Sequence, residues 1–449
     1  MKKKNFKNII YNTILIIILI VAFCIYRKYD YNFFSKGILE EGKTEFSRDF
    51  NIKYSKNRSY KIENNIANDA MFYKKISVRK NTPYRVSCMI KTENVIGKND
   101  NPIAGAQICL NNTEEHSRVI QGTNDWTKIE FFFNSKCNTE VEIGFRLGGN
   151  FAKASGKAWF SDLKLEEGAK NEDNTWNFSC FILDFADLEF EGEKHKYEIT
   201  NQEKSLVSIN MKRLQNSIKQ MSKNKMDIEY EIIEIKEPLT TISYDEENGY
   251  YISEKDVYRL IDRYQKEEEF DHIFVCTNLP LESELTHNKN ICEWIGLGNM
   301  MYIGKGFSNI RIIPEQYIYS NNNTFPEEVF LHEFLHTLER NAEEYGYSRP
   351  ALHDYQIYNY KDDRIEGQRK WYEDYMNCEI KTENGYIGLP PEIYKFKPVN
   401  STNFIYSNEL DILNEPMTIK EHIESVVYKI RKLFELKKAD FNVVTERGE

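Results

Sequence analysis

The hydrophobic pattern of this chain changes its period near residue 170, and this change limits the possible fold more than any other feature. Across 31–168, apolar and polar residues alternate in short stretches, such as 84–90, between turns of Asn, Gly and Pro. Strict alternation is typical of half-buried strands, so these stretches predict an all-β sandwich. A polar stretch over 169–177 is interpreted as a linker, and 178–449 then shows helical periods between short apolar runs. The sequence therefore predicts an all-β unit followed by an α/β unit.

The α/β unit is expected to alternate strands and helices in the order β-α-β-α-β-β-β-α. The expected strands cover 178–185, 228–235, 272–276, 300–303 and 310–313, and the expected helices cover 204–226, 253–265 and a stretch that begins at Thr324. This order predicts a mixed sheet with helices packed against it. Two glycine runs at 296–298 and 304–306 lack the spacing of a phosphate-binding loop, and we interpret them as loops beside a cleft.

Composition and charge exclude some classes of function. The chain is 41% hydrophobic, enough for packed cores, and carries a net charge of −10 with no Lys/Arg-rich stripe beyond its first residues. Such a surface argues against nucleic acid as a partner, because phosphate binding needs clustered cations. The eight cysteines include no Cys-x-x-Cys pair, which argues against a cysteine zinc site. One or two disulfides are compatible with a location outside the cell.

The N-terminus predicts a membrane anchor within a segment 1–30. Four lysines in the first seven residues precede an apolar run over 9–26, and Arg27 and Lys28 follow it. About 18 residues at ~1.5 Å per residue span roughly 27 Å, close to the thickness of a hydrocarbon core. The excess of lysine before the run predicts a single-pass cell-membrane protein with a cytoplasmic N-terminus and an extracellular bulk. A cleaved signal peptide, and hence a secreted protein, is the alternative.

A helix with an apolar stripe is expected to begin near residue 324. Thr324 is an N-cap residue, Pro326 follows in the first turn, and Glu327 stands at the third position of a capping box. Apolar residues then recur at helical spacing, at Leu331, Phe334, Leu335, Leu338 and Ala342. One face of this helix is therefore predicted to pack on the core.

The same helix carries His332, Glu333 and His336. Residues four apart lie on one side of a helix, so the two imidazoles can reach one ion at the ~2.0–2.1 Å that zinc requires. Glu333 is rotated by about 100° from His332, close enough to act as general base on an attacking water without being a ligand. Two incidental histidines on a solvated helix are the alternative, but the helix signals and the apolar stripe favour a catalytic zinc site.

The His-Glu-Phe-Leu-His run at 332–336 resembles the HExxH motif of the zincin-type zinc metallopeptidases, and the similarity extends over about 178–380. The resemblance implies a zincin-like peptidase domain with one catalytic zinc ion that hydrolyses peptide bonds in a protein or glycoprotein substrate. It also implies that 310–313 is an edge strand that pairs with an extended substrate. The chain departs from the metzincin pattern, because Glu339 and Ala342 stand where that pattern has Gly and His.

The third zinc ligand is left open by the sequence. His353 ranks first, because the break at Gly346 can return the chain to the metal, although a histidine bonded to a loop or core neighbour is the alternative. Asp354 ranks second, and Glu373 or Asp374 third.

Glu339 lies on the histidine stripe, but its Cα is about 10.5 Å along the helix axis from that of His332. One ion is hard to share over that distance, so Glu339 is expected to support a ligand by a hydrogen bond or to be a solvated surface charge. Five tyrosines are candidates for a hydroxyl that stabilises an oxyanion, namely Tyr355, Tyr358, Tyr360, Tyr372 and Tyr375.

The β unit also carries a resemblance, in three segments: Arg79-x-x-Thr82-Pro83-Tyr84, Gly122-Thr123-x-Asp125-Trp126-Thr127 and Gly156-Lys157-Ala158-Trp159-Phe160. Together they resemble a jelly-roll carbohydrate-binding module. The resemblance implies a jelly-roll sandwich, a possible glycan ligand and a possible structural calcium ion, for which the sequence names no ligands. We interpret Trp126 and Trp159 as core aromatics of the sandwich, because such rings mostly pack inward.

These features together predict a membrane-anchored, extracytoplasmic zinc metalloendopeptidase with a carbohydrate-binding-like module. A carbohydrate-binding surface adhesin with a catalytically inactive peptidase-like domain is the alternative. Zinc-dependent hydrolysis of a non-peptide amide, such as a cell-wall cross-link, is a third hypothesis. The intact Glu333 between the two histidines favours the enzyme over the adhesin.

Overall fold

The computed structural model describes residues 34–55, 58–169, 173–190, 192–265, 270–279, 294–312, 325–362, 367–398 and 406–412. The expected membrane anchor at 9–26 lies outside these ranges. Within them, no helix combines the length and the apolar character that a membrane crossing requires.

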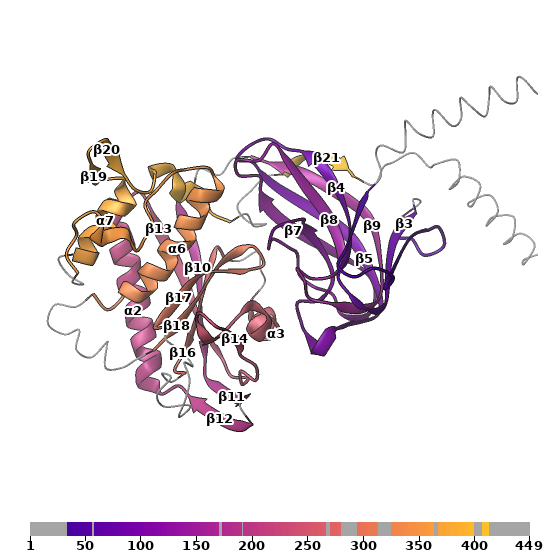
Figure 1. Cartoon of the computed structure of the whole chain (residues 1–449), viewed down its shortest axis with the longest axis horizontal. Coiled ribbons are helices and arrows are strands. Elements are labelled where there is room, and N and C mark those ends of the chain that lie inside the picture. Colours follow the sequence, from indigo (N-terminus) through magenta and orange to yellow (C-terminus); the bar gives the residue numbers. More distant parts are fainter. Residues whose placement is uncertain are drawn as a thin grey trace, which may run out of the picture.

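The first unit is a sandwich of two antiparallel sheets (Figure 1). The four-stranded sheet has the order β1-β4-β8-β6, and the other sheet has the order β2-β3-β9-β5-β7 with β21 attached to β9. The strands are β1 (Ser35–Ile38), β2 (Thr44–Asp49), β3 (Ser59–Asn68), β4 (Ala70–Ser77), β5 (Pro83–Gly97), β6 (Gly105–Leu110), β7 (Gly122–Asn134), β8 (Glu140–Gly148), β9 (Ala154–Gly168) and β21 (Tyr406–Asp411). Alternate side chains fill the core between the sheets, among them Phe72, Phe131, Phe133, Phe145 and Phe160. The predicted all-β sandwich is confirmed.

Strand β21 corrects the expected domain boundary, because 178–449 was expected to form one unit. β3 pairs with the first half of β9, and β21 pairs with its second half, where Tyr406 lies opposite Gly168. The open stretch of β9 would otherwise present unpaired N–H and C=O groups, which a later strand satisfies. Ile412 then enters the sandwich core. Residues 406–412 therefore belong to the first unit.

The second unit contains a five-stranded sheet in the order β13-β10-β16-β18-β17. The strands are β10 (Thr175–Leu183), β13 (Asp227–Ile235), β16 (His272–Thr277), β17 (Gly296–Tyr302) and β18 (Lys305–Arg311). Four of them are parallel, and β17 alone runs antiparallel, next to β18 at the edge. The expectation that 310–313 is the edge strand is therefore wrong. β18 is fully buried between two neighbours, and the edge strand is β17. The expected strand at 300–303 corresponds to the second half of β17, whereas the glycine run 296–298, interpreted as a loop, forms its first half.

Helices cover both faces of this sheet. On one face lie α2 (Asn201–Met221), α6 (Glu328–Glu344) and α7 (Arg369–Asn377), and on the other lies α3 (Glu254–Tyr264). Thr200 and Ser253 begin α2 and α3 with capping boxes. Three short hairpins complete the unit: β11 (Phe185–Phe190) with β12 (Glu193–Glu198), β14 (Ser243–Asp245) with β15 (Gly249–Tyr251), and β19 (Ile380–Thr382) with β20 (Gly385–Ile387).

The start of α6 differs from the expectation. The predicted cap Thr324 lies outside the described residues, and the helix begins at Glu328 with Glu327 as its N-cap. Phe325 is buried, and its carbonyl accepts a hydrogen bond from the Glu328 N–H, which closes a turn before the helix. The packing of Phe325 against the core therefore delays the helix beyond the local capping signal.

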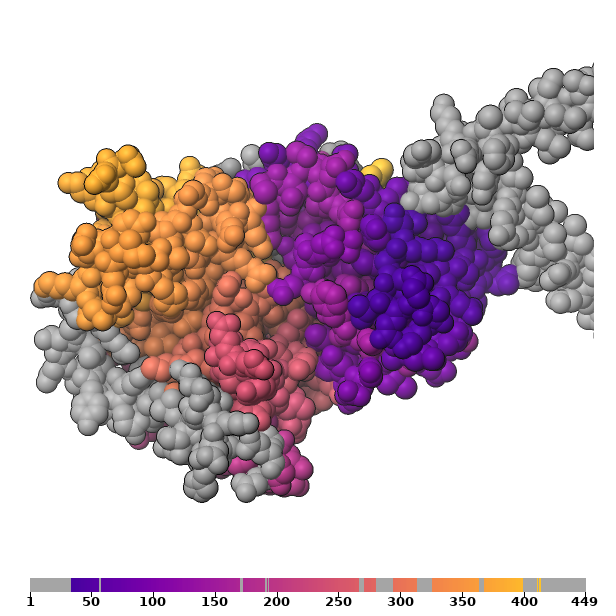
Figure 2. Space-filling model, viewed as in Figure 1, coloured from indigo at the N-terminus to yellow at the C-terminus, as the bar shows by residue number. Residues whose placement is uncertain are grey.

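The two units meet through charged and polar contacts (Figure 2). From α3, Arg259 pairs with Asp100 at 2.8 Å. From the C-terminal part of α6, Arg340 pairs with Glu114 at 2.9 Å. The helix that carries the expected catalytic motif is therefore in direct contact with the sandwich.

The six cysteines in the described residues, at 88, 109, 137, 180, 276 and 378, are free thiols. The Sγ atoms of Cys180 and Cys276 lie 3.5 Å apart in the core of the α/β unit. The expected one or two disulfides do not occur among these six, and Cys24 and Cys292 lie outside the described residues.

Candidate metal centre

Three histidines gather on the outer side of α6. His332, His336 and His353 each offer a ring nitrogen, and these atoms all lie within 4.8 Å of one another. The ring centroids are 4.9 Å apart for His332 and His336, and 4.9 and 5.1 Å from His353 to these two rings. A tetrahedral zinc ion with bonds of ~2.0–2.1 Å needs nitrogens about 3.3 Å apart, so small ring movements suffice. The donor set therefore fits zinc.

The chain returns His353 to α6 by the reversal that was expected after Gly346. Gly346 has a φ of +81°, a conformation that glycine adopts without strain, and it follows directly on the end of the helix. The next segment is tied back to the helix, because the N–H of Leu352 donates to Glu339 Oε1 at 3.0 Å. Trp371 Nε1 donates to the Leu352 carbonyl at 2.8 Å from α7. The residue before His353 is thus fixed from two sides.

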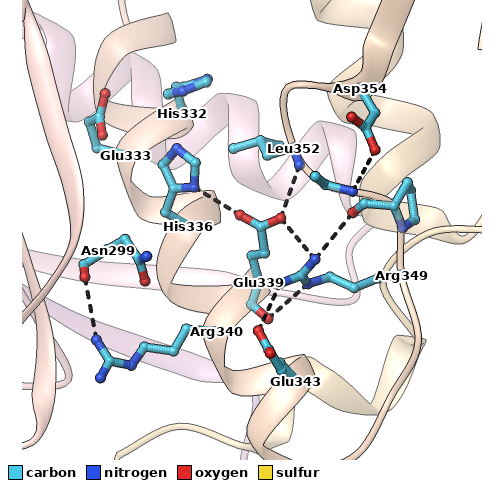
Figure 3. Close-up of polar contacts among 12 residues, drawn as sticks. Asn299, His332, Glu333, His336, Glu339, Arg340, Glu343, Arg349, Leu352 and Asp354 are labelled. Atoms are coloured by element: carbon cyan, nitrogen blue, oxygen red, sulfur yellow. Dashed lines mark hydrogen bonds and ion pairs between the residues drawn. The ribbon is translucent and has the colours of Figure 1, made fainter. Parts of the chain in front are cut away.

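Both helix histidines are oriented through their Nδ1 atoms. His332 Nδ1 lies 2.8 Å from the Tyr372 hydroxyl, which in turn donates to Glu328 Oε1 at 2.6 Å. His336 Nδ1 lies 2.9 Å from Glu339 Oε2 (Figure 3). Because these contacts engage Nδ1, the Nε2 atom of each ring is left for a metal, and acceptors of this kind fix the tautomer of metal-binding histidines. Glu339 was expected either to support a ligand by a hydrogen bond or to be a solvated surface charge, and the structure shows the hydrogen bond, to His336.

The surroundings of His332 and His353 favour the uncharged form of each ring, which is the form that binds a metal. Burial lowers the pKa of His332 to about 3, and the neighbouring His336 and His353 add to the effect. Burial and His336 also lower the pKa of His353. Protonation would therefore compete weakly with a metal ion at neutral pH.

Glu333 points toward the edge strand and not along the histidine stripe. A Cβ atom added at Gly296 would lie 2.4 Å from Glu333 Oε1, and one added at Gly298 would lie 2.7 Å from Oε2, so only glycine fits against the carboxylate. Burial and the nearby Glu328 raise the pKa of Glu333 to about 8, while a hydrogen bond from the Gly298 backbone opposes them. A cation held by the three histidines would favour the charged carboxylate.

A cavity of about 330 Å³ borders His332, His353 and Glu333. Its other lining residues are Ile295, Gly296, Glu328, Val329, Leu352, Tyr355, Gln368, Trp371 and Tyr372. Tyr355 and Tyr372 are thus the two expected tyrosines that line the cavity. The hydroxyl of Tyr360 donates to Asp374, and that of Tyr375 donates to the Pro350 carbonyl.

The other candidates for the third ligand are not part of the histidine group. Asp354 accepts a hydrogen bond from the Ala351 N–H at 3.1 Å, within its own turn. Asp374 accepts from Lys370 at 2.7 Å, and Glu373 lies 3.9 Å from the same lysine. Among the residues that the structure describes, the three histidines are the group of His, Cys, Asp and Glu side chains placed to share one ion. The calcium ion expected in the sandwich stays a prediction.

Of the two tryptophans of the sandwich, Trp159 is buried as expected, whereas Trp126 lies outside the core, which corrects the expectation for Trp126. Trp126 is half-buried and lies 6.0 Å from the ring of Tyr54, which is 53% exposed. Trp159 is buried, but Lys61 covers its ring, and its Nε1 donates to Asp49. The reason is the alternation of the strands: Phe131 on β7 faces the core, so Trp126 faces outward.

Comparisons with known proteins concern the sandwich. No protein-family model matches this chain, and no curated protein matches it. Similar solved structures include "CBM4 structure and function" (14% identity, 29% of this chain and 86% of that chain, TM-score 0.21). Another is TmCBM61 in complex with β-1,4-galactotriose (13% identity, 29% of this chain and 86% of that chain, TM-score 0.21). A third is the CBM22-1 xylan-binding domain of Paenibacillus barcinonensis Xyn10C (9% identity, 29% of this chain and 84% of that chain, TM-score 0.20).

These solved structures are carbohydrate-binding modules. The sandwich fold is established by its own strand pairing.

Proposed function

We propose that the α/β unit is a zinc-dependent endopeptidase, and that the sandwich binds a glycan near its substrate. The observation that carries the proposal is the group of His332, His336 and His353, with Glu333 beside it and each helix histidine held through Nδ1. Zinc held by these three nitrogens would act as a Lewis acid and lower the pKa of a water molecule that attacks a peptide bond.

The residues around this site supply the remaining chemistry. Glu333 is placed to take a proton from the attacking water and to deliver it to the leaving amine. Gly296 and Gly298 leave room for its carboxylate, and they belong to β17, which is the edge strand of the sheet in the part of the chain that the structure describes. An extended peptide can pair with such an edge, which would bring a peptide bond beside Glu333. The proposal therefore assigns to β17 the substrate-pairing role that the resemblance implied for 310–313.

The test uses a Glu333→Gln variant, which keeps the shape of the side chain but removes the base. We expect this variant to bind about one zinc ion per chain, as the unaltered protein does, and to lose roughly 10²- to 10⁴-fold in kcat/KM on a protein substrate such as casein. Glu343→Gln is the matched control, because Glu343 lies on the same helix with 77% of its side chain exposed. A folded protein without zinc, or equal rates for Glu333→Gln and the control, would refute the proposal.

The adhesin remains the second candidate, and the pair formed by the exposed ring of Tyr54 and the half-buried ring of Trp126 favours it, because accessible aromatic rings are suited to stacking on sugars. Glycan binding without cleavage of any protein or glycoprotein would support it. Cleavage that depends on Glu333 would exclude it. The membrane anchor and the extracellular location rest on the sequence of 1–30 and belong to the proposal for either function.

A further inference from the structure

A cleft of about 1190 Å³ lies between the sandwich and the α/β unit. On the sandwich side it is lined by outward-facing residues of β4 and β8, such as Met71 and Glu142, and by neighbouring loops. On the other side it is lined by Met301 of β17 and by Arg340 and Glu343 of α6. The volume exceeds that of most small-molecule sites, roughly 300–1,000 Å³, so it suits an oligomeric ligand.

The charges of this cleft are paired within the protein. Each of its lysines and arginines has a carboxylate partner, in the pairs Lys75–Glu140, Lys136–Glu115, Lys136–Glu344, Arg146–Asp69 and Arg340–Glu114. A phosphate or sulfate group would therefore meet no spare cation. Paired charges and the lining asparagines do offer many donors and acceptors. This lining suits a neutral ligand that carries many hydroxyl groups.

Phe151 supplies an aromatic surface at the cleft. Its side chain is 73% exposed, and its φ of +68° is unfavourable for a bulky residue. Asp69 holds this conformation, because it accepts the Phe151 N–H at 3.0 Å and is itself fixed by Arg146. An exposed ring held in a strained conformation indicates a functional role, and aromatic rings pack well against the apolar faces of sugars.

The cleft also reaches the proposed catalytic site. Arg340 lies one helical turn after His336, and its guanidinium donates to the Asn299 carbonyl on β17 and pairs with Glu114 of the sandwich. Met301 on β17 lines the cleft, while Gly298 lies against Glu333. Three residues of a regular strand would cover about 10 Å, and the irregularity of β17 between Leu297 and Met300 makes this an upper limit. A chain that pairs with β17 would thus pass from Glu333 to the cleft within a few residues.

We propose that this cleft binds the neutral glycan of a glycosylated polypeptide whose backbone pairs with β17. The cleavage of that polypeptide and the binding of a glycan by the sandwich rest on the proposed function, whereas the position of the glycan in this cleft does not. The sugar would lie on Phe151 between the sandwich and α6, and the peptide bond to be cut would lie a few residues from the glycosylated one. The substrate class is therefore a glycoprotein with neutral sugars.

The experiment uses Cys137, an exposed thiol in the cleft, as a handle. Modification of the full-length Glu333→Gln protein with a bulky maleimide should block the cleft. We expect it to weaken binding to a desialylated glycoprotein, such as asialofetuin, by more than ten-fold. The same reagent should leave a Cys137→Ser protein unaffected, which controls for modification of other thiols. Phe151→Ala should weaken binding by about five-fold without modification, since aromatic contacts contribute about 1 kcal/mol.

Three comparisons decide the outcome. Tyr54→Ala is the control, because Tyr54 is an exposed aromatic residue of the sandwich that is not in the cleft lining. Loss of binding in this variant, with unchanged binding after Cys137 modification and in Phe151→Ala, would overturn the inference. Unchanged binding to the enzymatically deglycosylated protein would also overturn it. Cleft-dependent binding with no cleavage by the unaltered protein would support the glycan site and refute the peptidase, so the two failures are distinguishable.

Discussion

Glu339 is expected to control the zinc affinity of the proposed site although it is too far along the helix to be a ligand. Its Oε2 accepts from His336 Nδ1 at 2.9 Å, and its Oε1 lies 3.0 Å from both the Leu352 N–H and Arg349 Nη1 (Figure 3). Burial raises the pKa of Glu339, but the hydrogen bond with His336 and the charge of Arg349 outweigh it and lower the pKa overall. One carboxylate therefore holds a helix histidine and the segment that carries His353.

Replacing Glu339 by Gln keeps the shape of the side chain but leaves only one acceptor oxygen. In the unaltered protein, His336 and the Leu352 N–H each bind a different oxygen of the Glu339 carboxylate. Either His336 or the Leu352 N–H then faces the amide NH₂ group, and the charge that assists both bonds is lost. Residues that orient a metal-binding histidine typically change metal affinity by ~10- to 100-fold. That range corresponds to about 1.4–2.7 kcal/mol of binding free energy. Because Glu339 supports two of the three histidines, we expect an effect near the upper end.

The assay is competition for zinc between the metal-free protein and a fluorescent chelator at fixed pH. Glu343→Gln is again the matched control: Glu343 pairs with the same Arg349 at 3.3 Å but is 77% exposed and contacts no histidine. We expect Glu343→Gln to bind zinc within about two-fold of the unaltered protein, since exposed ion pairs contribute little. An equally small change in Glu339→Gln, with both variants folded by circular dichroism, would refute the reasoning.

Two further predictions concern the sheet behind the helix. Gly296→Ala places a Cβ atom in the space of the Glu333 carboxylate, so we expect roughly 100-fold lower kcat/KM with unchanged zinc content; normal activity would show that the carboxylate has other room. His272 contacts Ser308 and Thr337, and burial lowers its pKa from 6.5 to about 3. Between these two pH values, His272 is therefore protonated in the unfolded chain and neutral in the folded protein. Stability should therefore fall as the pH falls from about 6.5 toward 3, by about 1.4 kcal/mol per pH unit for this group. His272→Gln should remove that part of the slope in urea unfolding measured at several pH values, and identical slopes would contradict the assignment.

The grouping of the three histidines could be predicted from the sequence because it depends on helical spacing and on one chain reversal. Two residues four apart meet on any helix, so His332 and His336 needed only the apolar stripe to be placed. His353 was ranked first because a glycine break can reverse the chain, and the reversal at Gly346 does bring it to the helix. What the sequence did not show is the role of Glu339 in holding that segment through the Leu352 N–H. Such a contact depends on side-chain geometry and not on spacing.

The edge of the sheet was assigned wrongly because glycine hides strand periodicity. β17 begins with Gly296 and Gly298, which carry no side chain to show alternation, so the run was interpreted as a loop. The same two glycines make room for Glu333, and this function explains why the strand lacks larger residues there. β18 has the stronger apolar signal because it is buried between two strands, which is typical of an interior position and not of an edge.

The pairing of β21 with β9 could not be predicted from local sequence patterns, because the whole α/β unit separates the two strands in the sequence. Tyr406 lies opposite Gly168, so the chain leaves the sandwich and returns to it at neighbouring positions of one sheet. A unit that is joined at both ends, and that also contacts its neighbour through α3 and α6, is less free to move than one on a single linker. The separation of the cleft walls is therefore restrained by these connections and contacts. A ligand can be recognised across such walls without a closing motion, which is the property that a joint glycan and peptide site requires.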